Sequence, residues 1–249
     1  MNNGVILCPK RSGSTFLQEA LNSHPQIVCY DELFMNNKNI RQRRGQILFK
    51  TKSKENGMNI KNYIDWVNDQ NPEKSTLFRL IYSHDSKYKV LNKIMDRNIS
   101  VIHLTRENLL EKELSRATKG KELGEKVELD IGTTLTQMRN EQKSNDQYRK
   151  KLKKYDNKIE IHYEDMIGNT EGKQEEIEKY GAFNILSNQV TYLNEKVGKQ
   201  ICKLLNVDYY PMWTHVSKRN PWNIENIIKN YDQVKEKLKH TEFSHLLKG

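Results

Sequence analysis

The chain has 249 residues, a length that one α/β domain with a buried core can fill, so we expect residues 1–249 to form a single domain. Charged residues make up 30% of the sequence, and no apolar run approaches the roughly 20 residues needed to cross a bilayer. The polar start at Met1 leaves no room for a signal peptide. The sequence therefore predicts a cytoplasmic protein without a membrane span.

The net charge of +10, from 42 basic and 32 acidic residues, predicts a surface that attracts anions. Two runs, 37–54 and 149–154, carry much of the basic excess. Neither run contains a known nucleic-acid-binding motif or aromatic residues interleaved with the charge. We therefore expect no nucleic-acid partner, and solvated surfaces account for both runs equally well.

Three cysteines, Cys8, Cys29 and Cys202, are widely spaced and lie among apolar residues. Their odd number and their spacing argue against a disulfide framework and against a Cys-x-x-Cys metal site. We expect reduced thiols in the core.

A buried strand, a tight loop and a helix open the chain. Residues 4–8 form a short apolar run without alternation, which is typical of a strand buried on both faces of a parallel sheet. From Thr15 the apolar residues recur at helical spacing until Pro25, which cannot continue a helix. A second strand over 26–30 then places Glu32 at its carboxyl end, where open sheets carry their chemistry.

Further apolar runs predict three more strands, with helices between and after them. The expected strands cover 76–82, 99–105 and 158–163, and the expected helices cover 60–67, 106–117, 134–154, 190–205 and 224–238. Because strands alternate with helices, the pattern predicts an α/β fold with a central, mainly parallel sheet flanked by helices.

The loop between the first strand and the first helix has the composition of a phosphate cradle. Its Ser and Thr residues lead into a helix whose N-terminal N–H groups and dipole favour an anion. Gly13 lets the backbone approach a ligand, and Arg11 supplies a planar fork that matches phosphate oxygens. An ordinary capped helix start is the alternative. The triphosphate-binding pattern GxxxxGK[ST] does not fit, because Ser14 stands where lysine is required.

Residues 9–17 (PKRSGSTFL) together with 21–25 (LNSHP) resemble the 5′-phosphosulfate loop of PAPS-dependent sulfotransferases, in the branch with an [RK]SG[ST][ST] loop and a following Ser-His-Pro. Weaker similarity extends to 102–110, 163–166 and 218–247. The resemblance implies a P-loop nucleotide-hydrolase-like sulfotransferase fold. It also implies in-line transfer of a sulfuryl group from PAPS to a hydroxyl or amine acceptor, with PAP as product and no metal.

The resemblance assigns the loop to cofactor binding. Arg11 would bind the 5′ phosphate and offset the charge that develops on the leaving phosphate, with Lys10 as a second cation. The cofactor-binding residues implied in this segment are Lys10, Arg11, Ser12, Gly13, Ser14, Thr15 and Phe16.

Glu32 is the implied general base that takes the proton of the acceptor, and it stands 21 positions after Arg11, as in related branches. The family has glycine before this glutamate, whereas this chain has Asp31, so either carboxylate is a candidate. A helix cap formed by the pair is the structural alternative. His84 is the fallback, because another sulfotransferase branch uses a histidine base, while His24 is expected to be structural.

The resemblance also implies a site for the 3′ phosphate, which the family holds with a strand-end arginine and a serine on the following helix. Arg106 and Ser115 match these two residues, although their interval is nine where many members have eight. Lys119, four positions after Ser115, would share its helix face. A pairing of Arg106 with Glu107 or Glu111 is the structural alternative.

Weaker predictions concern residues outside these segments. Arg79 lies in an apolar strand where related proteins often carry a basic residue, although snorkelling explains it as well. Lys218 or Arg219 would contact phosphate from a C-terminal segment that closes over the cofactor. Trp213 or Trp222 would stack on adenine or pack in the core.

Two other functions compete with the sulfotransferase. A small-molecule or nucleotide kinase lacks the loop lysine and a clear metal-binding aspartate, and a basic nucleic-acid-binding protein rests on net charge alone. His103, inside a predicted strand, is expected to be packed rather than catalytic. The acceptor stays open among small molecules, carbohydrates, lipids and peptides. A homodimer is a further possibility that the sequence leaves open.

Overall fold

The computed structural model describes residues 1–35, 49, 52–53, 57–122, 124–167, 190–216 and 224–247. Contacts between residues group the chain into two compact units. The first unit holds Met1–Thr105 and Lys154–Ser217, and the second holds Arg106–Lys153 and Lys218–Gly249. The prediction of one domain over 1–249 stays a prediction.

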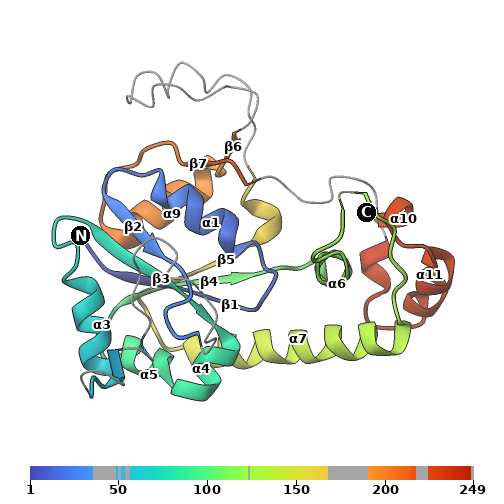
Figure 1. The fold of residues 1–249 in the computed structure, drawn as a ribbon, viewed down its shortest axis with the longest axis horizontal. Helices are drawn as coiled ribbons and strands as arrows, with labels where there is room; N and C mark the ends of the chain where they lie inside the picture. Colours follow the sequence, from blue (N-terminus) through green and yellow to red (C-terminus); the bar gives the residue numbers. More distant parts are fainter. Residues whose placement is uncertain are drawn as a thin grey trace. The chain divides into compact units, whose positions relative to one another are not determined.

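The first unit contains a five-stranded parallel sheet with the strand order β2-β3-β1-β4-β5 (Figure 1). The strands are β1 (Gly4–Cys8), β2 (Ile27–Tyr30), β3 (Ser75–Ile81), β4 (Ser100–Thr105) and β5 (Lys158–His162). Every residue of β1, β3 and β4 is buried, because helices cover both faces of the sheet. The predicted α/β class and parallel sheet are confirmed.

Helices pack on both faces of this sheet. In Figure 1, α1 (Ser14–Asn22) and α9 (Glu195–Leu205) lie on one side, and α3 (Ile60–Asn68), α4 (Tyr82–Tyr88) and α5 (Val90–Met95) lie on the other. Apolar side chains of α1 and α9 form one buried cluster with Ile6 of β1 and Ile102 of β4. This cluster fixes the direction in which α1 leaves the loop that follows β1.

The predicted helix over 190–205 was wrong at its beginning. Residues Thr191–Tyr192 form β6, which pairs antiparallel with β7 (Trp213–Thr214), and α9 begins only at Glu195. Asn194 ends the extended segment, because its side chain accepts hydrogen bonds from the backbone N–H groups of the next turn. A local cap therefore decided this boundary against the helical pattern.

The sequence also missed the two short helices after β3. Tyr82, predicted as the last residue of the strand, begins α4, and Lys89 separates α4 from α5 with a left-handed backbone at φ 54°. Asp85 supports this turn because its carboxylate accepts a hydrogen bond from the N–H of Leu91 at 2.6 Å. Helix α4 packs against β3, and α5 packs against α4.

The second unit is helical. It contains α6 (Leu109–Ala117), α7 (Ile131–Leu152), α10 (Ile224–Ile227), α11 (Tyr231–Lys239) and the 3₁₀ helix η4 (Ser244–Leu247), around an apolar cluster of their own. The predicted helix over 224–238 is interrupted, because Asn230 exchanges two side-chain hydrogen bonds with the backbone of Leu129. Asp130 caps α7, so this helix begins at Ile131, three residues before the predicted beginning at 134.

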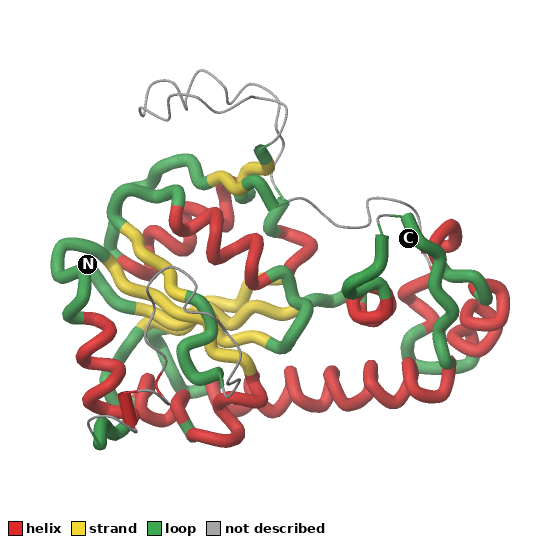
Figure 2. Tube along the Cα trace, in the orientation of Figure 1, coloured by secondary structure: helices red, strands yellow, loops and turns green. Residues whose placement is uncertain are grey.

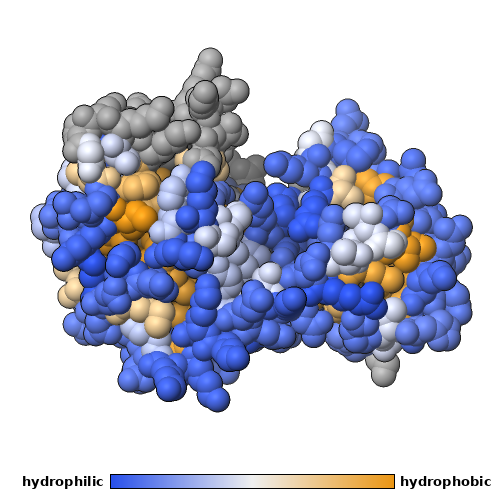
Figure 3. All heavy atoms as spheres, turned by 90° about the horizontal axis from the view of Figure 1, so that it is seen from below, coloured by the Kyte–Doolittle hydropathy of each residue, from blue (hydrophilic) through white to orange (hydrophobic). Residues whose placement is uncertain are grey.

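The described surface is mainly hydrophilic. Figure 3 shows polar side chains over most of the face in view, with apolar residues visible between them. Among the described residues, only Met1 and Ile167 are large apolar side chains with high exposure. No helix among the described residues is both long and apolar enough to span a membrane. The three cysteines are free and buried, as predicted.

Candidate functional site

The carboxyl ends of the parallel strands bring the candidate residues of the first unit to one edge of the sheet. The loop with Arg11 follows β1, Glu32 follows β2, and His84 follows β3 on α4. In Figure 2 loops follow β1 and β2, whereas α4 begins directly after β3. The strand order places β3 between β2 and β1, so a residue of β3 can reach both the loop and the carboxylates.

The loop after β1 has the backbone geometry of an anion cradle. Arg11 and Gly13 adopt left-handed backbone conformations, at φ 67° and 85°, whereas Ser12 between them does not. This alternation turns successive N–H groups toward one side, as in backbone nests that bind anions. For Arg11 the conformation costs about 1–2 kcal/mol, and such local strain gathers at functional sites.

The hydroxyl groups of the loop have different partners. Ser12 is fully buried and donates its hydroxyl to the carbonyl of Pro9 at 3.0 Å, so it has only its backbone to offer a ligand. Ser14 and Thr15 instead accept hydrogen bonds from Nη1 of Arg79, at 3.2 and 2.9 Å. Because a hydroxyl that accepts from arginine keeps its own proton, both groups can donate to an anion.

Arg79 joins this loop to the two carboxylates. Its Nη2 donates to Asp31 in a short ion pair and lies 3.7 Å from Oε1 of Glu32. The Arg79 side chain is only 8% exposed. An arginine buried to this degree requires charged partners, and the acidic pair supplies them.

Asp31 and Glu32 differ in their environment. Asp31 accepts from Arg79 and also from the backbone N–H of Glu32, at 2.7 Å for the second contact. Glu32 lies farther from its neighbours. Its Oε1 is 3.7 Å from Nη2 of Arg79, and its Oε2 is 3.9 Å from Nε2 of His84. Asp31 thus has two close donors, whereas Glu32 lies between the arginine and the histidine.

The pKa shifts in this cluster follow from burial and charge. Burial lowers the pKa of Arg79, but the Asp31 and Glu32 carboxylates more than offset it, so its pKa is raised. Burial lowers the pKa of His84, and the charges of Lys10 and Lys87 lower it further. At neutral pH the cluster therefore combines a charged guanidinium with an uncharged imidazole.

Arg79 is the residue whose role the sequence underestimated. It was predicted near the active site or as a snorkelling side chain, and the structure shows it inside the sheet with four polar partners. A signal was present, because Arg79 interrupts the apolar part of β3 and an arginine in a strand buried on both faces needs acidic partners. The identity of those partners could not be read from β3 alone.

Phe16 and Lys10, the two other loop residues predicted to bind the cofactor, lie in opposite environments. The Phe16 side chain is 6% exposed and packs in the core, so only its backbone can contact a cofactor. Lys10 is exposed, and its charge reaches His84.

The proposed 3′-phosphate residues lie in the second unit. Nη2 of Arg106 is 2.6 Å from Oε2 of Glu111, which is one of the pairings left open from the sequence. Ser115 lies on α6, but this helix ends at Ala117. Lys119 therefore lies beyond the helix, and the prediction that it shares a helix face with Ser115 was wrong.

The histidine interpretations are supported by their contacts. Nδ1 of His24 accepts a hydrogen bond from the N–H of Gln26, and its Nε2 lies 2.8 Å from the carbonyl oxygen of Asp208. The ring therefore stabilises the Ser-His-Pro turn. His103 is 2% exposed and lies 2.6 Å from the hydroxyl of Tyr82. Both side chains are structural, as expected.

The C-terminal candidates are only partly described. Trp213 packs against the β6 segment and contacts His215 edge-on, with ring centroids 5.3 Å apart, which favours packing over adenine stacking. Lys218, Arg219 and Trp222 lie outside the described residues.

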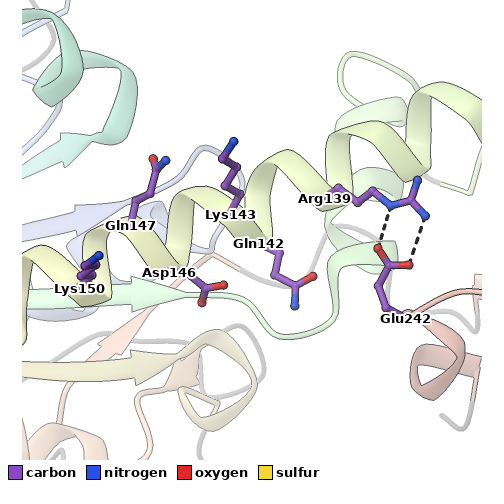
Figure 4. A pocket seen from close by; sticks show the side chains of 7 residues that line it. All are labelled: Arg139, Gln142, Lys143, Asp146, Gln147, Lys150 and Glu242. Carbon is purple, nitrogen blue, oxygen red and sulfur yellow. Dashed lines mark hydrogen bonds and ion pairs between the residues drawn. The ribbon is translucent and has the colours of Figure 1, made fainter.

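A groove of about 480 Å³ lies along α7 in the second unit (Figure 4). Its lining residues are Arg139, Gln142, Lys143, Asp146, Gln147, Lys150 and Glu242. Arg139 and Glu242 already form a two-point ion pair with distances of 2.8 and 3.2 Å, drawn as dashed lines in Figure 4. The groove has neither a glycine loop nor strand-end carboxylates, so we place the candidate site in the first unit.

Comparison with known proteins agrees with this placement. Residues 5–97 match the model of the sulfotransferase family. The matched segment contains the loop after β1, Glu32, Arg79 and His84, so the predicted family is confirmed for the residues that form the candidate site.

One solved structure similar to this chain is titled "Sulfotransferase Domain from the Curacin Biosynthetic Pathway". The two chains are 16% identical with a TM-score of 0.49, over 91% of this chain and 82% of the other. No curated protein matches the sequence.

Proposed function

We propose that the protein is a PAPS-dependent sulfotransferase, which moves a sulfuryl group from PAPS to a hydroxyl or amine acceptor. The observation that carries this proposal is the convergence of the anion loop and the strand-end carboxylates on one buried arginine, Arg79. A sulfuryl transferase needs an anion cradle and a proton acceptor close together, since its chemistry is positioning plus charge stabilisation. The family match over 5–97 supports the same reading.

The loop would hold the 5′-phosphosulfate end of PAPS, which supplies the activated sulfuryl group. Its backbone N–H groups and the hydroxyls of Ser14 and Thr15, which lie at the beginning of α1 and accept from Arg79, would donate to the anion. Arg11 would bind the phosphate and offset the negative charge that grows on it as the sulfur–oxygen bond breaks. Lys10 adds positive charge at the edge of the same loop.

Glu32 would act as the general base. It accepts the proton of the acceptor hydroxyl while the acceptor oxygen forms its bond to sulfur and the bond from sulfur to the phosphate oxygen breaks. Arg79 would hold the position of Glu32, 3.7 Å from its Oε1, and its ion pair with Asp31 would in turn position the arginine. His84, uncharged beside Glu32, is suited to receive the proton from Glu32 after transfer.

The remaining assignments rest on the resemblance. Arg106 and Ser115 are proposed to hold the 3′ phosphate, and Lys218 is proposed to contact phosphate from the C-terminal segment. The proposed acceptors are a small molecule, a carbohydrate, a lipid or a peptide, and the proposed location is the cytoplasm.

The cofactor is tested by thermal unfolding with PAP, the desulfated product. At 100 times its dissociation constant, PAP should raise the melting temperature by about 5–10 °C, because a ligand that binds only the folded state adds about 2.7 kcal/mol of stability. ATP with Mg²⁺ is the matched control for a kinase. Equal stabilisation by both ligands, or by neither, would contradict the assignment.

A second experiment tests the loop. Arg11→Ala should weaken PAP binding because it removes the planar cation of the loop.

A third experiment identifies the acceptor. Incubation of a cell extract with radiolabelled PAPS and the protein should label the acceptor, and the chemical class of the labelled product identifies the substrate.

A further inference from the structure

Gly13 has a neighbour from a distant part of the chain. A Cβ atom at position 13 would overlap Cδ2 of Tyr163, and it would lie 2.6 Å from Cε2 of that ring and 3.0 Å from Cε of Met166. Real Cβ atoms essentially never approach other atoms this closely, and a ring carbon cannot move away as a flexible side-chain end can. The ring of Tyr163 therefore occupies the space that a side chain at position 13 would need.

The ring is held firmly in place. Tyr163 directly follows β5 and begins the 3₁₀ helix η2 (Tyr163–Asp165). The preceding residue, His162, lies 3.0 Å from the hydroxyl of Thr105 on β4. Met166 is fully buried, and its N–H donates to the carbonyl of Tyr163 at 3.1 Å. Tyr163 itself is half-buried and packs against the apolar cluster of the first unit, so the sheet and the core set the position of the ring.

We propose that Tyr163 is a positioning residue that fixes the shape of the phosphate loop and thereby sets its affinity for the 5′ phosphate. The assignment rests on the proposed function, because it takes the loop as the 5′-phosphate site. Tyr163 packs against the loop at Gly13, and Arg79 holds the next two residues through their hydroxyls. The loop is therefore held by side chains from β3 and from the end of β5.

The two contacts have different consequences for the ligand. The Arg79 contact orients hydroxyl donors, whereas the ring of Tyr163 defines where the backbone at Gly13 lies, and with it the N–H groups around it. Ring carbons make this contact, so a variant that keeps the aromatic ring should keep the contact.

The test compares two ligands on three variants. PAP carries both phosphates and adenosine 3′-phosphate lacks the 5′ phosphate, so the ratio of their affinities reports on the loop alone. Tyr163→Ala should lower the affinity for PAP about tenfold, as expected when binding groups lose their fixed geometry, and leave that for adenosine 3′-phosphate unchanged. Tyr163→Phe should keep the wild-type ratio.

Tyr155→Ala is the matched control. Tyr155 is a tyrosine of the first unit that is buried, whereas Tyr163 is half-buried, and the Tyr155 hydroxyl donates to the carbonyl of Ile99, next to the amino end of β4. Tyr155→Ala should lower the melting temperature without changing the affinity ratio. An unchanged ratio in Tyr163→Ala, or an equal change in Tyr155→Ala, overturns the proposal.

A second measurement needs no ligand. Gly13→Ala should lower the melting temperature in both backgrounds because φ is 85° at this position, and it should do so less in the Tyr163→Ala background, because removal of the ring relieves the overlap with the new Cβ. Equal losses in both backgrounds overturn the packing that the proposal requires. If this coupling is present while the wild type binds neither nucleotide, the proposed cofactor is wrong and the ring contact stands; the positioning role in 5′-phosphate binding then falls with the cofactor.

Discussion

Each unit of the molecule buries a cation, and the two cations have different surroundings. Arg79 in the first unit contacts two carboxylates and two hydroxyls. Lys112 in the second unit has a side chain that is 1% exposed, and its Nζ lies 2.5 Å from Oε1 of Glu141 on α7. A buried pair of this kind is a structural arrangement, because one carboxylate compensates one ammonium.

The difference shows how a functional cation can be recognised. Arg79 connects a loop whose backbone is strained with carboxylates at the neighbouring strand end, so its fork organises several groups that a ligand can use. Lys112 connects two helices, and burial lowers its pKa, with the Glu141 carboxylate opposing this shift. The first cation should therefore control activity, and the second should control stability.

The largest expected effect is on catalysis at Glu32. Glu32→Gln should lower turnover by about 10²–10⁴-fold, the usual contribution of a general base, and should leave PAP affinity unchanged. Steady-state kinetics and a PAP titration measure the two quantities. Asp31→Asn is the matched control and should lower turnover less, since Asp31 serves Arg79. Full activity in Glu32→Gln would move the base to another residue.

The next effect tests the stabilising pair of the second unit. Glu141→Leu should lower the free energy of unfolding by about 3–5 kcal/mol, because it leaves the Lys112 ammonium buried without its carboxylate. Urea unfolding measures the loss. The double variant with Lys112→Met should recover most of the stability, since it removes the buried charge as well. Failure of the double variant to recover would show that packing, not charge, explains the loss.

A smaller effect is expected from Arg79→Lys. Lysine keeps the charge but presents one head group, so it cannot hold Ser14, Thr15 and Asp31 together. We expect kcat/KM to fall about tenfold, as for a displaced catalytic group. Arg97→Lys is a suitable control, because Arg97 also forms a two-point pair, with Asp65, in the same unit. Equal losses in both variants would remove the special role of Arg79.

The smallest effect concerns pH. Burial raises the pKa of the Glu113 carboxyl above its ordinary value of 4.5, although Arg116 and Lys112 oppose the shift. The folded state therefore favours the protonated carboxyl, so the contribution of Glu113 to stability is complete below pH 4.5 and is lost as the pH rises through the raised pKa. Relative to wild type, Glu113→Gln should gain stability over that interval in urea unfolding followed at several pH values. A constant difference between the two proteins would contradict the shift.

The sequence predicted the parallel sheet well because each central strand is buried on both faces and therefore contains a run of apolar residues without alternation. It located the loop between β1 and α1 for a local reason also, since small polar residues and glycine cluster at one helix start. The helix boundaries were less accurate where a single side chain decided them. Asn194 and Asn230 changed the ends of helices through hydrogen bonds to the backbone.

For the candidate site, the sequence by itself determined the loop, the glutamate after β2 and the family of the segment that holds them. Tertiary structure alone decided how these residues meet. Arg79 is 48 positions from Asp31 and 65 from Ser14, and Tyr163 lies beyond the end of β5, in the 3₁₀ helix η2. No local pattern encodes such contacts, because they depend on the order of strands in the sheet and on the face to which each side chain points.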